Sequence, residues 1–483
     1  MKKEADKDDH GSAGRSATKE ADGSAGRSAE RDDERRDASR GRPQLRWLAL
    51  PLRWLGILVR GLAGPPARAV RGTARRVADP ARQVVDHFAS ERVTVKQGFV
   101  AVVIASLTSL VAGLTLAGMS HRIDEVDGLF VLIPVSIGMR GNIFGALAAR
   151  LGTSIHTGLF EVSRAREGAL AQNVYAATLL TVATAVTMGL LARAVAGLLG
   201  LETVSALDFI VVALVGGLLS SVVVLAVTIY VSVTSYRRGW DLDSVGAPLI
   251  TAIGDVVTLP CLLVASYLVH IRVVTTTLGI VALVAGAASL FFGWTSSRGV
   301  ARRIVRESFP VLCIAIVLDV LAGAVVEPRV DEVFLRFSAL LIIVPGFLEN
   351  TGALGSILAA RLGSKLHLGV VTPTRRPDPA ALLDGTIVLA LGITVYVVTA
   401  LATLGLAEAT GADYPGALRF VGIVITGGVM ATLVAAVIGY YAATTTFRFG
   451  FDPDNHTIPL VTSGMDLMGV ICLVVALVVF GVA

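Results

Sequence analysis

Two distant stretches of this chain return later in the sequence with one common shift of 211 residues. The first motif, around "RGNIFGALAARLGTSIHTG", returns around "ENTGALGSILAARLGSKLHLG". Its matched positions are Pro134, Gly141, Arg150, Leu151, Gly152, His156 and Gly158, which recur as Pro345, Gly352, Arg361, Leu362, Gly363, His367 and Gly369. The same shift carries "DLDSVGAPLITAIGD" (Asp241–Asp255) onto "DPDNHTIPLVTSGMD" (Asp452–Asp466). One shift shared by two separate motifs indicates duplication of a single structural unit.

The chain is too apolar for a water-soluble protein. Of its 483 residues, 54% are hydrophobic, and the mean hydropathy is +0.72. The apolar runs predict spans at residues 97–119, 128–139 (continuing into the glycine-rich stretch), 172–199, 207–233, 245–270, 273–294, 308–327, 334–348, 383–407, 418–445 and 457–482. Such a pattern is typical of an all-α polytopic membrane protein, here with about 11 spans.

Charge and cysteine usage exclude several other classes. The net charge is +5, but the Arg residues lie in short loops and in the N-terminal tail, so nucleic acid is not expected as a partner. The cysteines Cys261, Cys313 and Cys472 lie in apolar runs without pairing or zinc-type spacing. Neither a disulfide framework nor a zinc site is therefore expected.

The N-terminal region differs from the rest of the chain. Residues 1–44 are charged and low in complexity, with "GSAGRSA" at Gly11–Ala17 and again at Gly23–Ala29, and we expect a disordered tail. Residues 45–92 mix Trp and Leu with regularly spaced Arg. Their apolar pieces are too short and too charged to span, so this region is expected to be a basic interfacial amphipathic segment that binds anionic lipids of the bilayer.

The repeat also predicts a topology. Five spans are an odd number, so a direct copy would be inverted unless a further span intervened, and the span at 273–294 supplies it. The halves are then parallel, related by a pseudo-two-fold axis along the membrane normal. Most loop Arg residues, at positions 237, 238, 298, 302, 303, 306, 375, 376 and 448, fall on one side, which is therefore expected to be cytoplasmic. The N-terminus is then cytoplasmic and the C-terminus extracytoplasmic.

Asp255 and Asp466 carry the strongest functional signal. Each lies inside an apolar span, where a carboxylate is costly and normally faces a cavity or the bundle interior. Because they match across the repeat, they can meet at the pseudo-axis. The alternative is a pair of protonated acids bonded to neighbouring helices. A carboxylate pair suits a hard divalent cation such as Mg²⁺, which keeps much of its water and prefers oxygen ligands.

Backbone carbonyls and amides could complete such a site where a helix breaks inside the protein. We expect this use for Gly141 and Asn142 in the first half, and for Asn350 and Gly352 in the second. The alternative for each glycine is close helix packing.

Other acidic residues allow two interpretations each. Asp241, Asp243, Asp452 and Asp454 precede the last span of each half and could form an acidic ring at a pore mouth or cap helix N-termini. Asp319 lies in an apolar span opposite Thr108 of the other half. It is a candidate coupling site for Na⁺ or H⁺, or a buried hydrogen-bonded group.

The combined motifs resemble the MgtE-type magnesium transporters, and more closely the two-repeat arrangement of solute carrier family 41. "PVSIGMRGN" (Pro134–Asn142) is similar to the family's second-helix signature, and "DPDNHTIPLVTSGMD" to its fifth-helix pattern. The resemblance implies a five-helix unit, a pore on the pseudo-dimer axis, and Mg²⁺ bound by the fifth-helix Asp, here Asp255 and Asp466. It also implies a role for Gly141–Asn142.

We therefore expect two MgtE-like repeats, at residues 97–271 and 301–483, joined by a linking transmembrane helix at 272–300. The expected function is divalent cation transport, with Mg²⁺ as the transported ion, across the plasma membrane. The sequence leaves open a channel or a Na⁺- or H⁺-coupled exchanger, and whether the pseudo-dimer assembles further. Two other classes are an intramembrane aspartyl hydrolase using Asp255 and Asp466 and a secondary transporter of small solutes.

Overall fold

A computed structural model describes residues 87–89, 91–156, 168–238, 242–450 and 457–483 of the chain. All of these belong to one compact unit, Thr73–Ala483. The predicted tail (1–44) and nearly all of the predicted interfacial segment (45–92) lie outside the described residues. So do the candidate pore-mouth residues Asp241, Asp452 and Asp454, and the side chain of Asp243, which itself lies in a helix.

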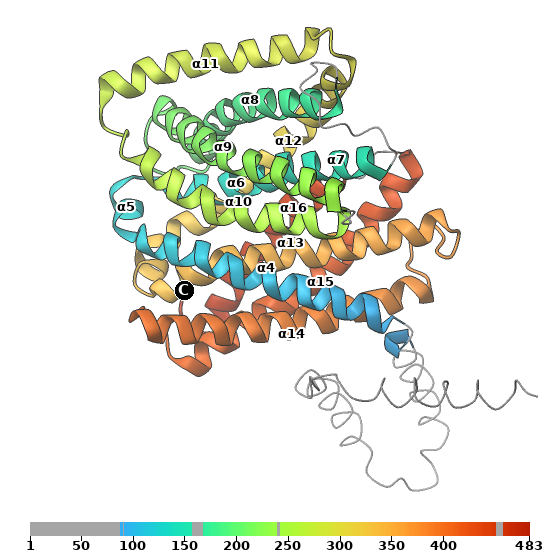
Figure 1. The fold of residues 1–483 in the computed structure, drawn as a ribbon. Coiled ribbons are helices and arrows are strands. Elements are labelled where there is room, and N and C mark those ends of the chain that lie inside the picture. The colour runs from blue at the N-terminus through green and yellow to red at the C-terminus, as the bar shows by residue number, and fades with distance from the viewer. Residues whose placement is uncertain (1–86, 90, 157–167, 239–241, 451–456) are drawn as a thin grey trace, which may run out of the picture. The chain divides into compact units, whose positions relative to one another are not determined.

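The described residues form helices and no strand (Figure 1). The first half comprises α4 (Arg92–Gly118), α5 (Ser120–Glu125), α6 (Leu129–Arg140), the π-helical turn η2 (Gly141–Gly145), α7 (Ala146–His156), α8 (Ala169–Leu198), α9 (Ala206–Arg238) and α10 (Leu242–Ser266). After α11 (Arg272–Thr295), the second half comprises α12 (Gly299–Val326), the short turns η3 (Glu327–Arg329) and η4 (Val330–Phe334), α13 (Ser338–His367), α14 (Pro379–Thr410), α15 (Ala417–Phe449) and α16 (Ile458–Val479).

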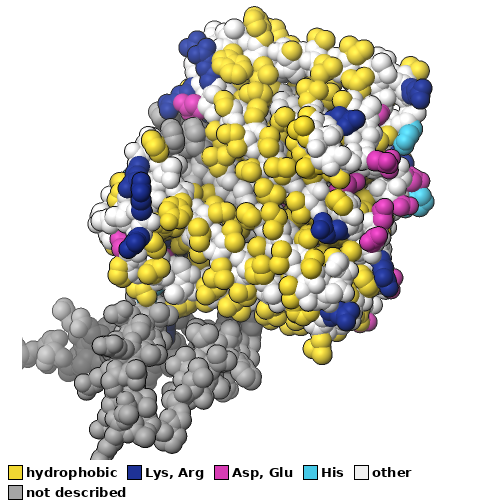
Figure 2. Space-filling model, turned by 180° about the vertical axis from the view of Figure 1, so that it is seen from behind, with side chains coloured by type: hydrophobic (Ala, Val, Ile, Leu, Met, Phe, Trp, Pro, Cys, Tyr) yellow, Lys and Arg dark blue, Asp and Glu magenta, His cyan; other side chains and the backbone are white. Residues whose placement is uncertain are grey.

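Within the described residues, ten helices are long and apolar enough to cross a membrane, and a shorter apolar helix covers Ile250–Ser266 in α10. The prediction of an all-α polytopic membrane protein is thereby confirmed. Figure 2 shows a face covered mostly by hydrophobic side chains, with acidic and His side chains gathered at one edge. Leu198 and Val222, for example, are 87% and 69% exposed. Such a surface is stable only against lipid.

Helix bounds in the two halves follow the same shift of 211 residues as the motifs. α9 (Ala206–Arg238) corresponds to α15 (Ala417–Phe449), and α8 corresponds to α14 within a residue or two at each end. The α6–η2–α7 segment corresponds to α13, α4 to α12, and α10 to α16. α11 has no counterpart, packs against α8, α9 and α12, and buries only 22% of its most apolar stretch. It is a peripheral connection between the halves (Figure 1).

The first helix of each half packs on the other half. α4 contacts α13 and α14 of the second half, as well as α10 of its own (Figure 1). Reciprocally, α12 contacts α6 and α8 of the first half, as well as α16 of its own. The two halves therefore form one interlocked core, because neither can separate without exposing the other's first helix.

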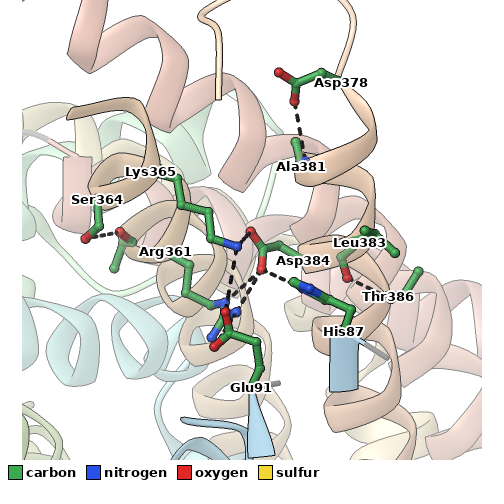
Figure 3. A network of polar contacts seen from close by, with 11 residues as sticks. His87, Glu91, Arg361, Ser364, Lys365, Asp378, Ala381, Leu383, Asp384 and Thr386 are labelled. Atoms are coloured by element: carbon green, nitrogen blue, oxygen red, sulfur yellow. Dashed lines mark hydrogen bonds and ion pairs between the residues drawn. The ribbon is translucent and has the colours of Figure 1, made fainter. Parts of the chain in front are cut away.

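A cluster of charged residues fastens the beginning of α4 to the second half (Figure 3). The buried Asp384 of α14 accepts hydrogen bonds from Arg361 (2.8 Å) and Lys365 (2.6 Å) of α13. His87 Nε2 lies 3.3 Å from the same carboxylate, and Glu91 lies 3.4 Å from Arg361. In the first half, the counterparts of Arg361 and Asp384 are Arg150 and the neutral Asn173, and Arg150 donates a hydrogen bond to Asn173 at 2.9 Å. The contact between the second and third helices of a half is thus a hydrogen bond to a neutral amide for Arg150 and an ion pair for Arg361.

The glycine-rich stretches differ from the sequence-based expectation. The spans predicted at 128–139 and 334–348 are too short, because the apolar helices continue to Ile155 and His367. The expected helix break at Asn350–Gly352 is wrong, since α13 is continuous there. In the first half the only irregularity of this segment is the π-helical turn η2. The glycines do not require a break in the helix, because they allow close contacts with the fifth helices, α10 and α16.

Candidate functional site

Asp255 of α10 and Asp466 of α16 occupy matching places in the two halves, and their carboxylates lie within electrostatic range of each other. Asp255 is 1% exposed, whereas Asp466 is half-buried. No basic side chain pairs with either acid in the described part of the chain. Two carboxylates within electrostatic range of each other and without a counter-charge form a site suited to a cation.

Two further acids lie near this pair. Glu349 of α13, which is half-buried, interacts electrostatically with both Asp255 and Asp466. Asp319 of α12 is fully buried and interacts with Asp466. Sequence reasoning missed Glu349, although a Glu inside an apolar run was a sufficient signal. Asp319 was among the residues that the sequence singled out. Both its oxygens lack a hydrogen-bond partner among the described residues, so the structure does not show the buried hydrogen-bonded group that was one of its two interpretations.

Polar side chains from neighbouring helices surround the acids. Ser109 of α4 donates to Asp255 Oδ2 at 3.3 Å. The first helix, which packs on the other half, therefore contacts the site directly. Asn142, in the π-helical turn, accepts from Thr462 (3.1 Å) and donates to Ser463 (3.3 Å), both on α16 near Asp466. Asn142 is thus placed at the boundary between the halves. Its position agrees with a role as a neutral oxygen ligand or as a holder of α16.

Asn350 is placed differently. Its side-chain oxygen accepts from Ser106 of α4, and its amide nitrogen donates to Thr399 of α14 at 3.0 Å. The residue is fully buried. The structure therefore uses the Asn350 amide for contacts among α4, α13 and α14.

Gly141 and Gly352 are equivalent packing positions. A Cβ at Gly141 would lie 3.3 Å from Thr251 Cγ2 of α10, and a Cβ at Gly352 would lie 3.7 Å from Thr462 Cγ2 of α16. Thr251 and Thr462 are themselves repeat counterparts. Each glycine brings a second helix close to the fifth helix that carries the membrane Asp, which is the packing alternative considered for these residues.

A small cavity lies beside Asn142, between helices of the two halves. Its lining includes Asn142 and Arg150 from the first half, and Ser308 and Pro459 from the second. Among the described residues, no group of three or more His, Cys, Asp or Glu side chains is close enough to hold a metal directly. A cation here would keep part of its hydration shell, which Mg²⁺ does readily.

The divalent cation transporter model of the MgtE family matches this chain twice, at residues 133–265 and 344–476. The two matches begin and end with the same shift of 211 residues as the motifs, and together they cover more than half of the chain. The chain belongs to the MgtE family. Both matches contain the fifth-helix acid, Asp255 in the first and Asp466 in the second.

Relatives of known name agree with this membership. Solute carrier family 41 member 3 of Rattus norvegicus is 22% identical over 401 residues, covering 78% of this chain and 85% of its own length. Its counterpart in Mus musculus is 23% identical, covering 74% and 77%. Solute carrier family 41 member 2 of Homo sapiens is 22% identical, covering 76% and 67%. A comparison with solved structures found no match.

As an MgtE-family transporter, this chain is not an enzyme. The alternative of an intramembrane aspartyl hydrolase is therefore wrong, and so is a transporter of small solutes, since the family moves divalent cations.

Arg140 is a further residue of interest that the sequence analysis did not single out. It is buried in α6, where it donates to the Gly217 carbonyl oxygen at 3.0 Å and to Ser221 of α9. Its guanidinium points toward α9, which leaves the acids without a counter-charge.

Proposed function

We propose that this protein transports Mg²⁺ along the interface between its two halves, with Asp255 and Asp466 holding the ion transiently. The observation that supports this most is the electrostatic proximity of these matched acids, one from each half, with no basic partner among the described residues. In a low-dielectric setting two such carboxylates repel each other strongly unless a proton or a cation lies between them. Mg²⁺ suits the site because it binds through one or two carboxylates while it retains water.

Access to the site would come from the end of the bundle that carries Arg150. The cavity beside Asn142 lies between helices of both halves and includes Arg150 in its lining. We place the cytoplasm at this end, since the loop Arg residues cluster there, and Asp241, Asp243, Asp452 and Asp454 would then concentrate cations at the pore mouth. The N-terminus is then cytoplasmic and the C-terminus outside the cell.

The proposed architecture is a pseudo-dimer of parallel repeats, 97–271 and 301–483, related by an axis along the membrane normal. The matching helix bounds and the reciprocal packing of α4 and α12 support this arrangement. The basic segment 45–92 would bind anionic lipids of the plasma membrane, and the tail 1–44 would remain in solution.

Cation-resolved uptake by the purified protein in liposomes tests the function. Mg²⁺ should enter, and competing divalent cations define the selectivity. Uptake that requires an opposing Na⁺ or pH gradient would indicate coupled exchange, for which Asp319 is the candidate coupling residue, whereas uptake without either gradient would indicate a channel. Absence of divalent uptake under every gradient would contradict the proposal.

A further inference from the structure

The two acids beside the central pair occupy non-equivalent positions of the repeat. The counterpart of Glu349 in the first half is Gly138, and the counterpart of Asp319 is Thr108. Both acids therefore belong to the second half, and the first half has neither. Asp319 is on the first helix of its half, α12, whereas Glu349 is on the second, α13.

The space left by Gly138 is occupied by Asp319. A Cβ at Gly138 would lie 2.7 Å from Asp319 Oδ2 and 3.6 Å from Asp466 Oδ2. The missing side chain of α6 is thus replaced by a carboxylate that reaches the same point from α12. From that point it faces Asp466, the fifth-helix acid of its own half.

On the other side of the pair, Glu349 of α13 is an acid that interacts electrostatically with Asp255. Its carboxylate is the charged group that acts most strongly on Asp255, ahead of Asp466. Asp319 likewise acts on Asp466 more strongly than Glu349 does. The four acids therefore divide into two pairs, Asp255 with Glu349 and Asp466 with Asp319, one beside each fifth helix.

The burial of Asp319 requires an explanation, because the side chain is fully buried and neither oxygen has a hydrogen-bond partner among the described residues. A buried carboxylate without a hydrogen bond or a basic partner is costly and is usually retained where a cation binds. Ser463, whose hydroxyl accepts from Asn142, lies beside the Asp319 carboxylate without a hydrogen bond of acceptable geometry to it. The carboxylate is aimed at Asp466, so these oxygens are available to a shared ion.

We propose that Asp319 and Glu349 are equivalent cation-binding carboxylates that reach the path from non-equivalent helices, so that the path binds two partly hydrated divalent cations, one at each carboxylate pair. This proposal rests on the proposed function and extends it. It also explains why position 138 carries no charge: an acid there would be a third carboxylate beside Asp319 and Asp466.

The test moves the carboxylate from one helix to the other. Asp319→Ala removes it, and Asp319→Ala combined with Gly138→Glu restores it from α6, as Glu349 supplies it from α13 in the other half. The matched control is Asp319→Ala with Gly138→Gln, which has the same size but no charge. Removing the Asp319 carboxyl also frees the space that a side chain at 138 needs. Each purified variant is titrated with Mn²⁺, an octahedral oxygen-seeking analogue of Mg²⁺, and binding is followed by electron paramagnetic resonance.

We expect Asp319→Ala and the Gln double variant to lose one bound Mn²⁺ per chain, or to bind it about tenfold more weakly. The Glu double variant should regain that binding. Unchanged Mn²⁺ binding in Asp319→Ala, or equal binding in the Glu and Gln double variants with all proteins folded by thermal unfolding, would overturn the proposal. Because the readout is binding, it is separable from the proposed function: a wild-type protein that binds Mn²⁺ as expected but moves no Mg²⁺ would contradict only transport.

Discussion

Gly113 of α4 lies so close to Ile342 of α13 that a Cβ on the glycine would come within 1.8 Å of the Ile342 carbonyl oxygen. The reciprocal contact places Gly323 of α12 against Val131 of α6, where a Cβ would lie 2.7 Å from backbone atoms. Ile342 and Val131 are repeat counterparts. The two halves are therefore fastened twice by the same device, a glycine on the exchanged first helix that meets the backbone of the other half's second helix.

Gly113→Ala should destabilise the protein, because the added methyl group meets backbone rather than a movable side chain. We expect a loss of about 1–3 kcal/mol, as for other overpacked contacts, measured by thermal unfolding in detergent. Gly118→Ala on the same helix is the control, since nothing lies within 4 Å of its Cβ position. Equal unfolding temperatures for the two variants would contradict the close packing of α4 on α13.

Asp384→Ala should destabilise the protein more than Asn173→Ala, although the two residues are counterparts. Loss of Asp384 leaves the partly buried Arg361 and Lys365 without their main partner, for which a cost of about 3 kcal/mol is expected. Loss of Asn173 removes one hydrogen bond to Arg150, with a cost of about 1 kcal/mol. Unfolding in detergent measures both, and an equal effect would show that the charged cluster of Figure 3 adds nothing to the neutral contact.

The sequence predicted the helical class, and it placed most spans within a few residues, because lipid allows only long apolar helices and these are visible as apolar runs. It did not predict the continuous α13. A glycine pair in an apolar run is compatible with a break or with close packing, and only the positions of Thr251 and Thr462 on the facing helices distinguish the two. The exchange of α4 and α12 between halves also leaves no local signature, since it depends on contacts between distant segments.

The candidate site was predicted in part. Asp255, Asp466 and Asp319 are visible as acids within apolar spans, and the repeat pairs the first two. Glu349 was overlooked, because attention to matched positions discounts an acid whose counterpart is Gly138. The amide of Asn350 could not be assigned from the sequence, since its partners Ser106 and Thr399 lie on other helices.

The two asparagines should behave differently when they are replaced. Asn142→Ala should weaken Mg²⁺ flux and also lower stability by about 1 kcal/mol, because Asn142 lies at the cavity and its amide bonds Thr462 and Ser463 of α16 beside Asp466. Asn350→Ala should lower stability by about 1 kcal/mol and leave the apparent affinity for Mg²⁺ unchanged, because its amide joins α4 to α14 through Ser106 and Thr399. Flux assays and thermal unfolding of both variants separate these effects, and a selective flux defect in Asn350→Ala would contradict its assignment to packing.

Mg²⁺ itself should stabilise the folded protein through its site. At a concentration 100-fold above the dissociation constant, a ligand bound only by the folded state adds about 2.7 kcal/mol. The unfolding temperature of the wild type in detergent should therefore rise with Mg²⁺. The double variant Asp255→Asn with Asp466→Asn should not respond, whereas the distant variant Asn173→Ala should respond like the wild type. A full response in the double variant would place the stabilising ion elsewhere.

The most direct test of the central claim is Mg²⁺ flux into liposomes that contain Asp255→Ala or Asp466→Ala, compared with the wild type at equal amounts of folded protein. If the ion is held between these two acids, each single variant falls to the rate of empty liposomes while its unfolding temperature stays near that of the wild type. Wild-type flux in both variants would contradict the account.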